Sequence, residues 1–298
     1  MVWLDGKLVE KVDVSPLSHS LHYGGAVFEG IRFYEIPCSG ARSVFRLRDH
    51  INRLFASAQA VGMEIPYSVE QLCEAVLATV KQSGLHAGYI RPLIFRGEGI
   101  GLMAPRIQVH TMVAVLPWAN GLESVRLATS KIIRLHPDST NINAKVAGHY
   151  VNSYMAATEA RKLGADDALL LDWQGNVAES SVANVFFVKG DKVFTPPRKN
   201  IFAGLTRDSV IHLSGFLGIQ VEEKEIPLAQ ALESDAMFLA GTACEVLPVK
   251  SLDGKTFDMN NPIVKRVREC YLGTVDSSIP FDGPWLTTLE PATWVKNS

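Results

Sequence analysis

Two short clusters of turn-forming residues divide this chain of 298 residues into two long stretches of regular pattern. The clusters are Leu116-Pro117-Trp118-Ala119-Asn120-Gly121 and Pro137-Asp138-Ser139-Thr140-Asn141. Proline lacks a backbone donor, and glycine, asparagine and aspartate favour turns, so helices and strands tend to end there. A chain of this length is long for one core and suits two domains. We expect a small N-terminal domain over residues 1–122, a linker over 123–136 and a larger C-terminal domain over 137–298.

The N-terminal stretch mixes helical and strand patterns. Residues 48–63 repeat apolar side chains with a helical period, and residues 69–83 form a second helix that ends before Gly84, a favourable C-terminal glycine. An Asp5-Gly6 turn joins two short strands. The expected strands lie at 2–4, 8–9, 26–34, 89–95 and 109–116. This pattern predicts an α+β domain.

The C-terminal stretch contains more strands. One helix covers 147–163 and ends at Gly164, and another begins at Thr206. The turn Gln174-Gly175-Asn176 separates two of the strands. The expected strands lie at 168–172, 185–188, 193–195 and 236–240. The chain as a whole therefore reads as α+β, with the larger domain rich in strands.

Charge and hydrophobicity exclude several classes of partner. The net charge of -2 gives no electrostatic reason to expect nucleic acid or an anionic membrane. No stretch approaches the roughly 20 apolar residues that cross a bilayer, and charges interrupt the N-terminus too often for a signal peptide. We expect a cytoplasmic protein. The four scattered cysteines, expected as free thiols, are Cys38, Cys73, Cys244 and Cys270.

Several familiar site motifs are absent from the sequence. Gly97, Gly99 and Gly101 have the spacing GxGxG and not the GxGxxG of dinucleotide sites, so a loop is the simpler interpretation. No GxSxG or HExxH pattern occurs. His19 and His22 lack accompanying metal ligands, so no metal site is expected.

Three short clusters remain as candidates for chemistry. The first surrounds Lys145, in Asn143-Ala144-Lys145-Val146-Ala147-Gly148-His149-Tyr150. A lysine before a helix is usually a solvated surface residue, but small and apolar neighbours favour burial. Burial lowers the pKa of an ammonium group, and the neutral amine is the nucleophile of covalent carbonyl chemistry.

The other two clusters hold a carboxylate and free backbone amides. Glu179 lies in Val177-Ala178-Glu179-Ser180-Ser181-Val182-Ala183-Asn184, where it either faces solvent or pairs with a pyridinium nitrogen. Gly204-Leu205-Thr206 and Gly241-Thr242-Ala243 place amides and a hydroxyl at turns, the first of them at a helix start. A helix start is a suitable site for a phosphate ester.

Four more segments extend this pattern through the N-terminal half. They are Ser18-His19-Ser20-Leu21-His22-Tyr23-Gly24-Gly25, Val27-Phe28-Glu29-Gly30-Ile31-Arg32, Phe45-Arg46-Leu47-Arg48-Asp49-His50-Ile51-Asn52-Arg53-Leu54 and Tyr89-Ile90-Arg91-Pro92-Leu93. With the three clusters, in this order, the chain resembles the class IV, or fold-type IV, pyridoxal-phosphate enzymes. It is most similar to the branched-chain amino acid aminotransferases, from residue 1 to about Val249.

The resemblance implies the two-domain α+β fold of the D-amino-acid aminotransferase type, with pyridoxal 5′-phosphate as cofactor. It implies that Lys145 is the catalytic residue and carries the cofactor, and that Glu179 binds the pyridinium nitrogen. The cofactor-binding residues that it implies are Arg53, Lys145, Tyr150, Glu179, Leu205, Thr206 and Thr242. The substrate-binding residues that it implies are Tyr23, Phe28, Arg32, Tyr89, Arg91, Thr242 and Ala243.

The activity implied is amino transfer from L-leucine, L-isoleucine or L-valine to 2-oxoglutarate, in a homodimer or higher homo-oligomer such as a dimer-based hexamer. One departure keeps alternatives open. Family members often have Glu-Gly-x-Gly-Glu-Asn where this chain has Glu179-Ser180-Ser181-Val182-Ala183-Asn184. That variant is similar to D-amino-acid or (R)-amine transaminases and to aminodeoxychorismate lyases. A cofactor carrier without catalysis is a further alternative, which the complete set of Lys145, Tyr150 and Glu179 argues against.

Overall fold

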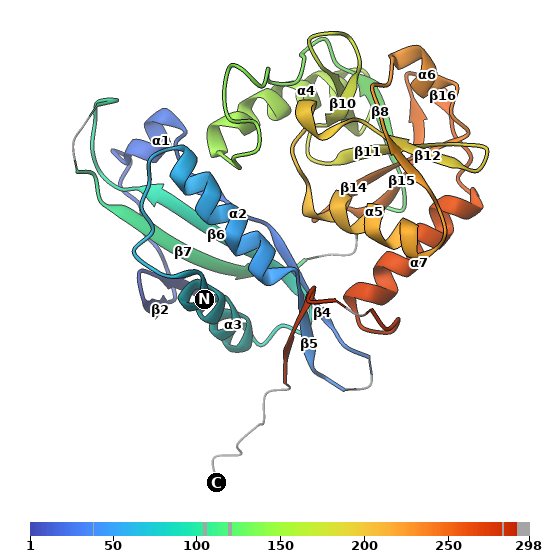
Figure 1. The fold of residues 1–298 in the computed structure, drawn as a ribbon. Helices are drawn as coiled ribbons and strands as arrows, with labels where there is room; N and C mark the ends of the chain where they lie inside the picture. Colours follow the sequence, from blue (N-terminus) through green and yellow to red (C-terminus); the bar gives the residue numbers. More distant parts are fainter. Residues whose placement is uncertain (38, 104–105, 119–120, 282, 291–298) are drawn as a thin grey trace. The chain divides into compact units, whose positions relative to one another are not determined.

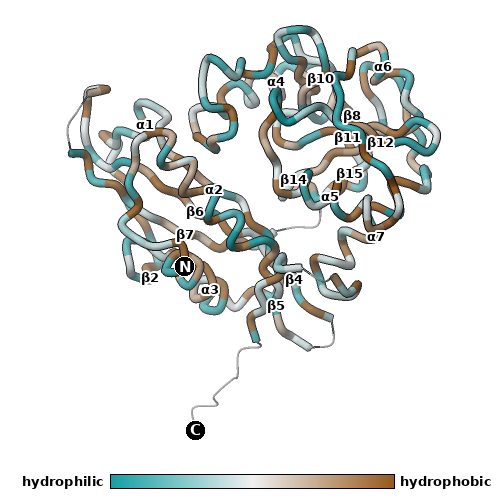
Figure 2. The backbone as a smooth tube through the Cα atoms, viewed as in Figure 1, coloured by the Kyte–Doolittle hydropathy of each residue, from teal (hydrophilic) through white to brown (hydrophobic). Residues whose placement is uncertain are grey.

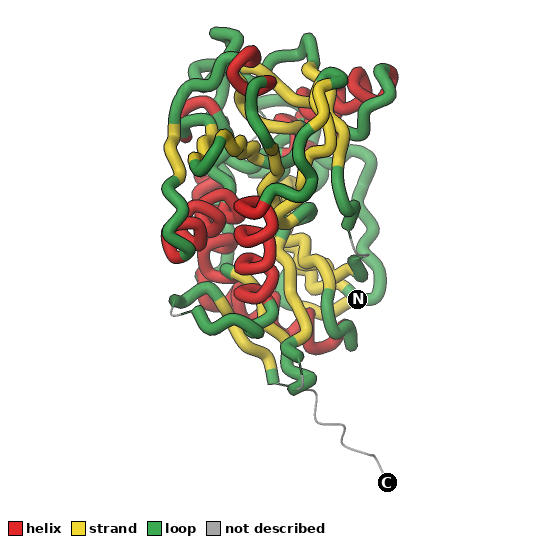
Figure 3. The backbone as a smooth tube through the Cα atoms, turned by 90° about the vertical axis from the view of Figure 1, so that its right-hand side faces the viewer, coloured by secondary structure: helices red, strands yellow, loops and turns green. Residues whose placement is uncertain are grey.

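The structure is a computed structural model that describes residues 1–37, 39–103, 106–118, 121–281 and 283–290. Within these residues the chain divides into two compact units, and both contain helices and strands (Figures 1 and 3). The first unit comprises the described residues of Met1–Ala119, Ala144–Gly148 and Gly273–Ser298. The second unit comprises those of Asn120–Asn143 and His149–Leu272.

The first unit is built on an antiparallel sheet that has eight strands within the described residues. Its order is β17-β5-β4-β6-β7-β1-β2, and β3 pairs with β6. The strands are β1 (Val2–Leu4), β2 (Lys7–Val9), β3 (Val27–Phe28), β4 (Ile31–Glu35), β5 (Arg42–Phe45), β6 (Gly88–Arg96), β7 (Val109–Leu116) and β17 (Leu286–Leu289).

Helices α2 (Leu47–Ala60) and α3 (Val69–Ser83) pack against this sheet (Figure 1), and the short α1 (His19–Tyr23) lies between β2 and β3 in the chain. A reciprocal pair of hydrogen bonds between Ser68 and Gln71 caps the start of α3. Polar and apolar residues alternate along α2, whereas the strands beneath it are mostly apolar (Figure 2). The buried faces of both helices thus form one core with the sheet.

The second unit contains a sheet of nine strands within the described residues. Its order is β10-β9-β8-β15-β14-β11-β12-β13, β16 pairs with β15, and an additional pairing joins β10 to β11. That pairing closes six of the strands into a ring, as in a small barrel. The strands are β8 (Val125–Thr129), β9 (Asp167–Leu171), β10 (Val177–Ser180), β11 (Asn184–Lys189), β12 (Lys192–Thr195), β13 (Val221–Glu223), β14 (Ala236–Gly241), β15 (Glu245–Leu252) and β16 (Lys255–Thr256).

Helices of the second unit connect and cover these strands (Figure 1). They are α4 (Tyr150–Lys162), α5 (Leu205–Phe216), α6 (Leu228–Leu232) and most of α7 (Pro262–Val275), with the short 3-10 turn η2 (Arg198–Asn200). The 3-10 turn η1 (Ala147–His149) and the last turn of α7 contain residues that belong to the first unit. The rings of Phe186 and Phe238 stack at 4.9 Å in the core. None of the helices in the described part of the chain is long and apolar enough to span a bilayer.

The observed units differ from the expected boundaries in two respects. The expected linker, 123–136, contains β8, which lies between β9 and β15 inside the second sheet. Residues 144–148 and the described residues from 273 onward belong to the first unit, although they follow the expected N-terminal domain. Both differences arise from pairings between distant segments, which local sequence patterns do not contain.

Most expected elements are confirmed, including the hairpin at the N-terminus, α2, α3, β6, β7, α4, β9, β11, β12, α5 and β14. The unexpected ones are α1, β5, β8, β10, β13, α6, β15, β16, α7 and β17. Cys73, Cys244 and Cys270 are free thiols, as expected, and Cys38 lies outside the described residues.

Candidate active site

The backbone around Lys145 is bound to the first unit. Lys145 N donates to Ser57 Oγ at 2.9 Å, and Lys145 O accepts from Phe28 N at 3.1 Å. The pairing continues with Ala147 N to Ala26 O at 2.7 Å and Gly148 N to Gly24 O at 2.9 Å. The segment 144–148 is therefore bound to residues 24–28 by backbone hydrogen bonds and one antiparallel bridge between Val27 and Val146, and the position of Lys145 is set by α2 and β3.

Two glycines allow this close approach of backbones. Gly24 has a φ of +66°, which favours glycine, and a Cβ there would lie 3.0 Å from Gly148 Cα. A Cβ on Gly148 would lie 3.1 Å from Gly24 O. Side chains at either position would push the Lys145 segment away from the unit that holds it.

The Lys145 side chain is half-buried and lies beside an aromatic ring. Its Nζ is 5.2 Å from the centre of the Phe28 ring. The guanidinium of Arg91 also approaches this ring, with its Cζ 4.6 Å from the centre. Phe28 thus contacts two cationic groups, an arrangement that its π-face stabilises.

Arg91 and Tyr89 project from β6 and form the polar part of the same cluster. Arg91 Nη2 donates to the Tyr89 hydroxyl at 2.9 Å. Within the described residues the buried Arg91 Nε has no hydrogen-bond partner. A buried cationic donor without a partner is costly, so this position favours an anionic ligand such as a carboxylate. Gly30 is required here, because a Cβ on it would lie 2.0 Å from the Tyr89 hydroxyl.

Arg32 lies opposite Tyr89 in the pairing of β4 with β6. Its Cζ is 5.1 Å from the centre of the Tyr34 ring and 5.8 Å from that of Trp118. Trp118 in turn stacks on Tyr89 at 4.8 Å. Trp118 was not predicted as a site residue, because it lies in the turn-forming cluster that follows the expected strand 109–116.

Tyr23 belongs to a different part of the first unit. Its hydroxyl accepts a hydrogen bond from Gly101 N at 3.0 Å, and its ring lies 4.6 Å from that of His19. Within the described residues it does not join the cluster of Phe28, Tyr89 and Arg91.

Arg53 projects from α2 onto a buried carboxylate. Its Nε donates to Glu29 Oε1 at 2.6 Å, and its Nη2 donates to Glu29 Oε2 at 2.9 Å. Burial alone would raise the pKa of Glu29, but the positive charge of Arg53 holds that pKa well below its usual value of 4.5. Glu29 is fully buried, so its charge is neutralised inside the protein.

His50 completes this group. Its Nδ1 lies 2.7 Å from Glu29 Oε2. Burial lowers the pKa of His50 below 6.5, against the attraction of the Glu29 charge, and the nearby charges of Arg53 and Lys145 lower it further. His50 is therefore neutral near pH 7. Neither Glu29 nor His50 was predicted as a site residue, although both lie within the segments that carry the family resemblance.

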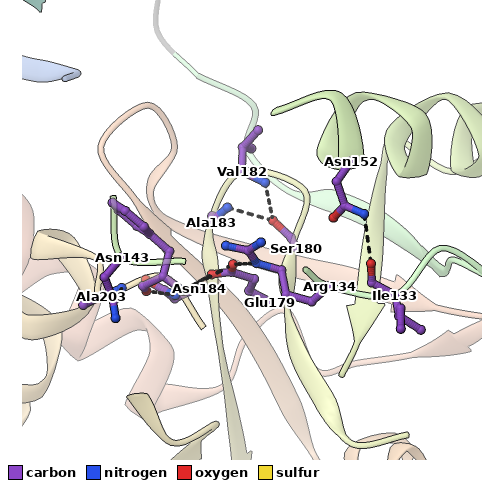
Figure 4. Close-up of polar contacts among 11 residues, drawn as sticks. Ile133, Arg134, Asn143, Asn152, Glu179, Ser180, Val182, Ala183, Asn184 and Ala203 are labelled. Atoms are coloured by element: carbon purple, nitrogen blue, oxygen red, sulfur yellow. Dashed lines mark hydrogen bonds and ion pairs between the residues drawn. The ribbon is translucent and has the colours of Figure 1, made fainter. Parts of the chain in front are cut away.

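The second unit holds Glu179 on β10, where it is buried. Arg134 Nε donates to Oε1, and Asn184 Nδ2 donates to Oε2 at 3.0 Å (Figure 4). The backbone N–H of Phe202 contacts both oxygens, at 3.3 and 3.2 Å. Arg134 was not anticipated, because it stands alone in the expected linker.

Asn184 connects this carboxylate to the start of α5. Its Nδ2 also donates to Phe202 O at 3.0 Å. A Cβ on Gly204, the N-cap of α5, would lie 2.1 Å from Asn184 Oδ1, so only glycine fits there. Ala203, between Phe202 and Gly204, donates its backbone N–H to Asn143 Oδ1 at 3.1 Å (Figure 4). The first amides of α5 are thus fixed next to the segment that holds Glu179.

Comparison with known proteins identifies the family. The amino-transferase class IV family model matches residues 26–252. The chain belongs to the class IV aminotransferases. The branched-chain-amino-acid aminotransferase of Pseudomonas aeruginosa is 35% identical to it over 97% of this chain and 97% of that protein.

Solved structures of class IV aminotransferases share the fold. The branched-chain aminotransferase of Thermoproteus uzoniensis with norvaline has a TM-score of 0.92 at 39% identity, over 96% of this chain and 98% of that one. The branched-chain amino acid aminotransferase of Escherichia coli has a TM-score of 0.92 at 34% identity, over 96% of this chain and 97% of that one. The expected family and the two-domain α+β class of fold-type IV are confirmed.

The candidate site residues of this aminotransferase divide between its units. The first unit carries Tyr23, Phe28, Arg32, Arg53, Tyr89, Arg91 and Lys145, and the second carries Tyr150, Glu179, Leu205, Thr206, Thr242 and Ala243. Class IV aminotransferases depend on pyridoxal phosphate. The donors in both units fit that group, because they include an amine beside an aromatic ring, an oriented guanidinium, a buried carboxylate and a helix start beside an obligatory glycine.

Proposed function

We propose that this chain transfers the amino group of L-leucine, L-isoleucine or L-valine to 2-oxoglutarate, with pyridoxal 5′-phosphate carried on Lys145. Its named relatives are branched-chain-amino-acid aminotransferases, which supports the amino-acid class. The observation that carries the proposal is the cluster of Phe28, Tyr89 and Arg91 beside the Lys145 amine. This cluster offers an apolar ring and a half-buried cation to an apolar amino acid.

Lys145 is the group that moves protons. When bound, pyridoxal phosphate supplies an electron sink for the carbanion formed at the substrate Cα. Once the incoming amino acid has displaced Lys145 from the cofactor, the freed Lys145 amine would move the proton of the substrate Cα, acting first as base and then as acid. Its backbone bonds to Ser57 and Phe28 keep the amine at one place during both steps.

Glu179 holds a proton on the ring nitrogen of the cofactor. Its carboxylate is fixed by Arg134, Asn184 and the Phe202 amide, so it needs no reorganisation when a cation faces it. Tyr150 donates toward the O3′ oxygen of the ring. These roles follow the family resemblance, and the hydrogen bonds around Glu179 support the first of them.

The phosphate and the substrate carboxylates are bound by cations and amides. The phosphate is bound by Arg53, by Thr242 and by the amides of Leu205 and Thr206 at the start of α5, which favour an anion. The substrate α-carboxylate is bound by Tyr89, by Arg91 and by the turn Thr242-Ala243. Phe28 contacts the substrate side chain, Tyr23 lies at the edge of the pocket, and Arg32 receives the second carboxylate of 2-oxoglutarate.

The serines that follow Glu179 have a structural explanation. Ser180 Oγ accepts a hydrogen bond from Ala183 N at 3.0 Å, and Ser181 Oγ donates to Asp167 (Figure 4 shows the first). Both hydroxyls therefore stabilise the tight turn between β10 and β11. This departure from the common motif gives no support to the D-amino-acid, (R)-amine or lyase alternatives.

A donor panel tests the proposal. Initial rates of glutamate formation from 2-oxoglutarate are measured with L- and D-leucine, isoleucine, valine and alanine and with an (R)-amine. We expect the three branched L-donors to give the largest kcat/KM. A preference for D-alanine or the (R)-amine would contradict the substrate class and leave the cofactor chemistry intact. The homo-oligomer and the cytoplasmic location remain predictions from the sequence.

A further inference from the structure

Glu29 is a fully buried charge to which the proposed reaction assigns no step. It lies between β3 and β4, and its backbone N donates to Pro92 O at 2.9 Å, so the main chain at this position is fixed. Its two carboxylate oxygens bind Arg53 at 2.6 and 2.9 Å and His50 at 2.7 Å. His50 and Arg53 are three residues apart on α2 and therefore point from one face of the helix.

This geometry fixes the plane of the Arg53 guanidinium. Two parallel N–H···O bonds to one carboxylate hold the planar fork in a single orientation, which one bond could not do. The pair uses two of the five N–H donors of an arginine. Arg53 is mostly buried, with 15% of its side chain exposed, and the rigid carboxylate below it restricts a side chain that is otherwise flexible.

We propose that Glu29 is a positioning residue that orients Arg53 toward the phosphate of pyridoxal 5′-phosphate. The inference rests on the proposed function, in which Arg53 binds that phosphate. Glu29 itself touches neither cofactor nor substrate. Neutral His50 holds the second carboxylate oxygen without adding a charge that would weaken the pair with Arg53.

Electrostatics and positioning predict opposite signs for the loss of this carboxylate. The negative charge of Glu29 repels a phosphate dianion and reduces the attraction of Arg53 for it. If charge alone mattered, Glu29→Gln would bind the phosphate ester more tightly. If Glu29 orients the fork, the same variant binds it more weakly. The direction of the change therefore separates the two effects.

The test compares two ligands on apoprotein freed of cofactor. Dissociation constants are measured for pyridoxal 5′-phosphate and for pyridoxal, which has the same aldehyde and no phosphate. Supporting partners of ligand residues at metal sites are worth about 10- to 100-fold in affinity, and we expect Glu29→Gln to weaken pyridoxal 5′-phosphate by that order. Affinity for pyridoxal should be unchanged. Inorganic phosphate should also compete less well against the phosphorylated ligand in the variant.

Two further variants keep the test decisive. Glu29→Asp retains the negative charge that neutralises Arg53, but its side chain is shorter by one methylene. It should show the same selective loss even if Glu29→Gln does not fold. Glu70→Gln is the matched control. Glu70 lies on α3 and pairs at 2.5 Å with Arg48, which lies on α2 as Arg53 does, and 59% of the Glu70 side chain is exposed. It should leave both affinities unchanged.

Arg53→Gln separates failure of this inference from failure of the proposed function. If Arg53→Gln loses the preference for the phosphorylated ligand while Glu29→Asp and a folded Glu29→Gln retain it, the role of Glu29 is wrong. If Arg53→Gln also retains the preference, the phosphate role of Arg53 is wrong. Equal losses for both ligands in the Glu29 variants would show a merely structural role and would overturn the inference.

Discussion

The two units fix charged groups of opposite sign by the same means. In the first, the cationic Arg53 is oriented by the buried Glu29, and in the second the anionic Glu179 is oriented by the buried Arg134. Each pair leaves the functional ion in one geometry and neutralises its charge within its own unit. A site built this way does not need to reorganise when a ligand of opposite charge arrives, which is the main source of electrostatic catalysis.

The units differ in how they place their reactive residues. Lys145 lies on a segment of five residues, 144–148, that the first unit binds mainly through backbone hydrogen bonds. Glu179 lies on β10, one of the strands that form the ring in the second unit, and is fixed mainly through side chains. The position of the lysine therefore depends on a long-range backbone pairing, whereas that of the carboxylate depends on a network of polar side chains within its own unit.

Lys145→Ala should have the largest effect and tests the first half of the comparison. Under the proposed function no other group replaces the amine that carries the cofactor, so turnover should be abolished. The purified variant should lose the visible absorbance of the covalently bound cofactor while it retains its fold, because the backbone bonds of residue 145 remain. Lys162→Ala, at the end of α4, is the control. Turnover at the wild-type rate in Lys145→Ala would break the assignment.

Glu179→Gln tests the second half at nearly constant volume. Under the proposed function the charge of Glu179 keeps the ring nitrogen protonated, so its loss should lower kcat by about 100-fold or more, within the range of acid–base contributions. Thermal unfolding should change much less, because Asn184 and Phe202 can still donate to the amide oxygen. Glu123→Gln serves as a control within the second unit. An unchanged kcat would reduce Glu179 to a structural partner of Arg134.

The sequence predicted one half of each charged pair. Arg53 and Glu179, like Lys145, lie in short ordered motifs, and the resemblance assigned them roles. Their supporting partners were not predicted, because Glu29 and Arg53 are 24 residues apart, and Arg134 and Glu179 are 45 apart. Pairings of that range depend on the folded sheets, which local periodicity does not describe.

The same limit explains the misplaced boundaries of the fold. Long amphipathic helices such as α2 and α3 and turn-flanked strands such as β6 and β7 were predicted, because their patterns are local. Strand β8 is only five residues long and follows a cluster of turn formers, so its place inside the second sheet was not visible. The return of 144–148 to the first unit has no local signal at all.

Arg32→Ala should distinguish the roles of two cations of the first unit, Arg32 and Arg91. Arg32 lies beside the rings of Tyr34 and Trp118, and Arg91 lies beside the rings of Phe28 and Tyr89. We expect kcat/KM for glutamate and 2-oxoglutarate to fall roughly tenfold, the loss of one charged hydrogen bond, with leucine much less affected. The measurement is kcat/KM for each substrate. Equal losses for all substrates would remove the specific role of Arg32.

Wild-type rates provide a second measure of the same pocket. Each buried methylene is worth about 0.8 kcal/mol, so L-leucine should exceed L-alanine in kcat/KM by roughly tenfold or more if its side chain packs on Phe28. Phe28→Ala should reduce this ratio. A ratio that does not change in the variant would place the leucine side chain elsewhere.

Ser57→Ala tests whether the Lys145 segment depends on the first unit. Ser57 is buried, and its Oγ accepts the Lys145 N–H at 2.9 Å. Loss of that acceptor should lower the free energy of unfolding by about 1–2 kcal/mol and increase hydrogen exchange at the Lys145 amide. Ser39→Ala, on an exposed turn, is the control. If exchange at Lys145 were unchanged, the segment would be held by its pairing with residues 24–28 alone.

His50 should give the smallest effect, a loss of stability on mild acidification that originates in the first unit. Burial lowers the pKa of His50 in the folded state below 6.5, so the unfolded chain binds a proton first as the pH falls. Its contribution is present above pH 6.5 and is lost as the pH falls toward the lower folded value. The pKa of Glu29 is also lowered, so its own contribution is lost only below about pH 4.5, in a separate window.

Urea unfolding at pH 7.0 and 5.5 measures the loss of stability that His50 causes, and His50→Gln should remove this loss. His86→Gln, on the exposed surface of the same unit, should retain it. An equal pH dependence in wild type and His50→Gln would show that the Glu29 pair does not depend on a neutral histidine.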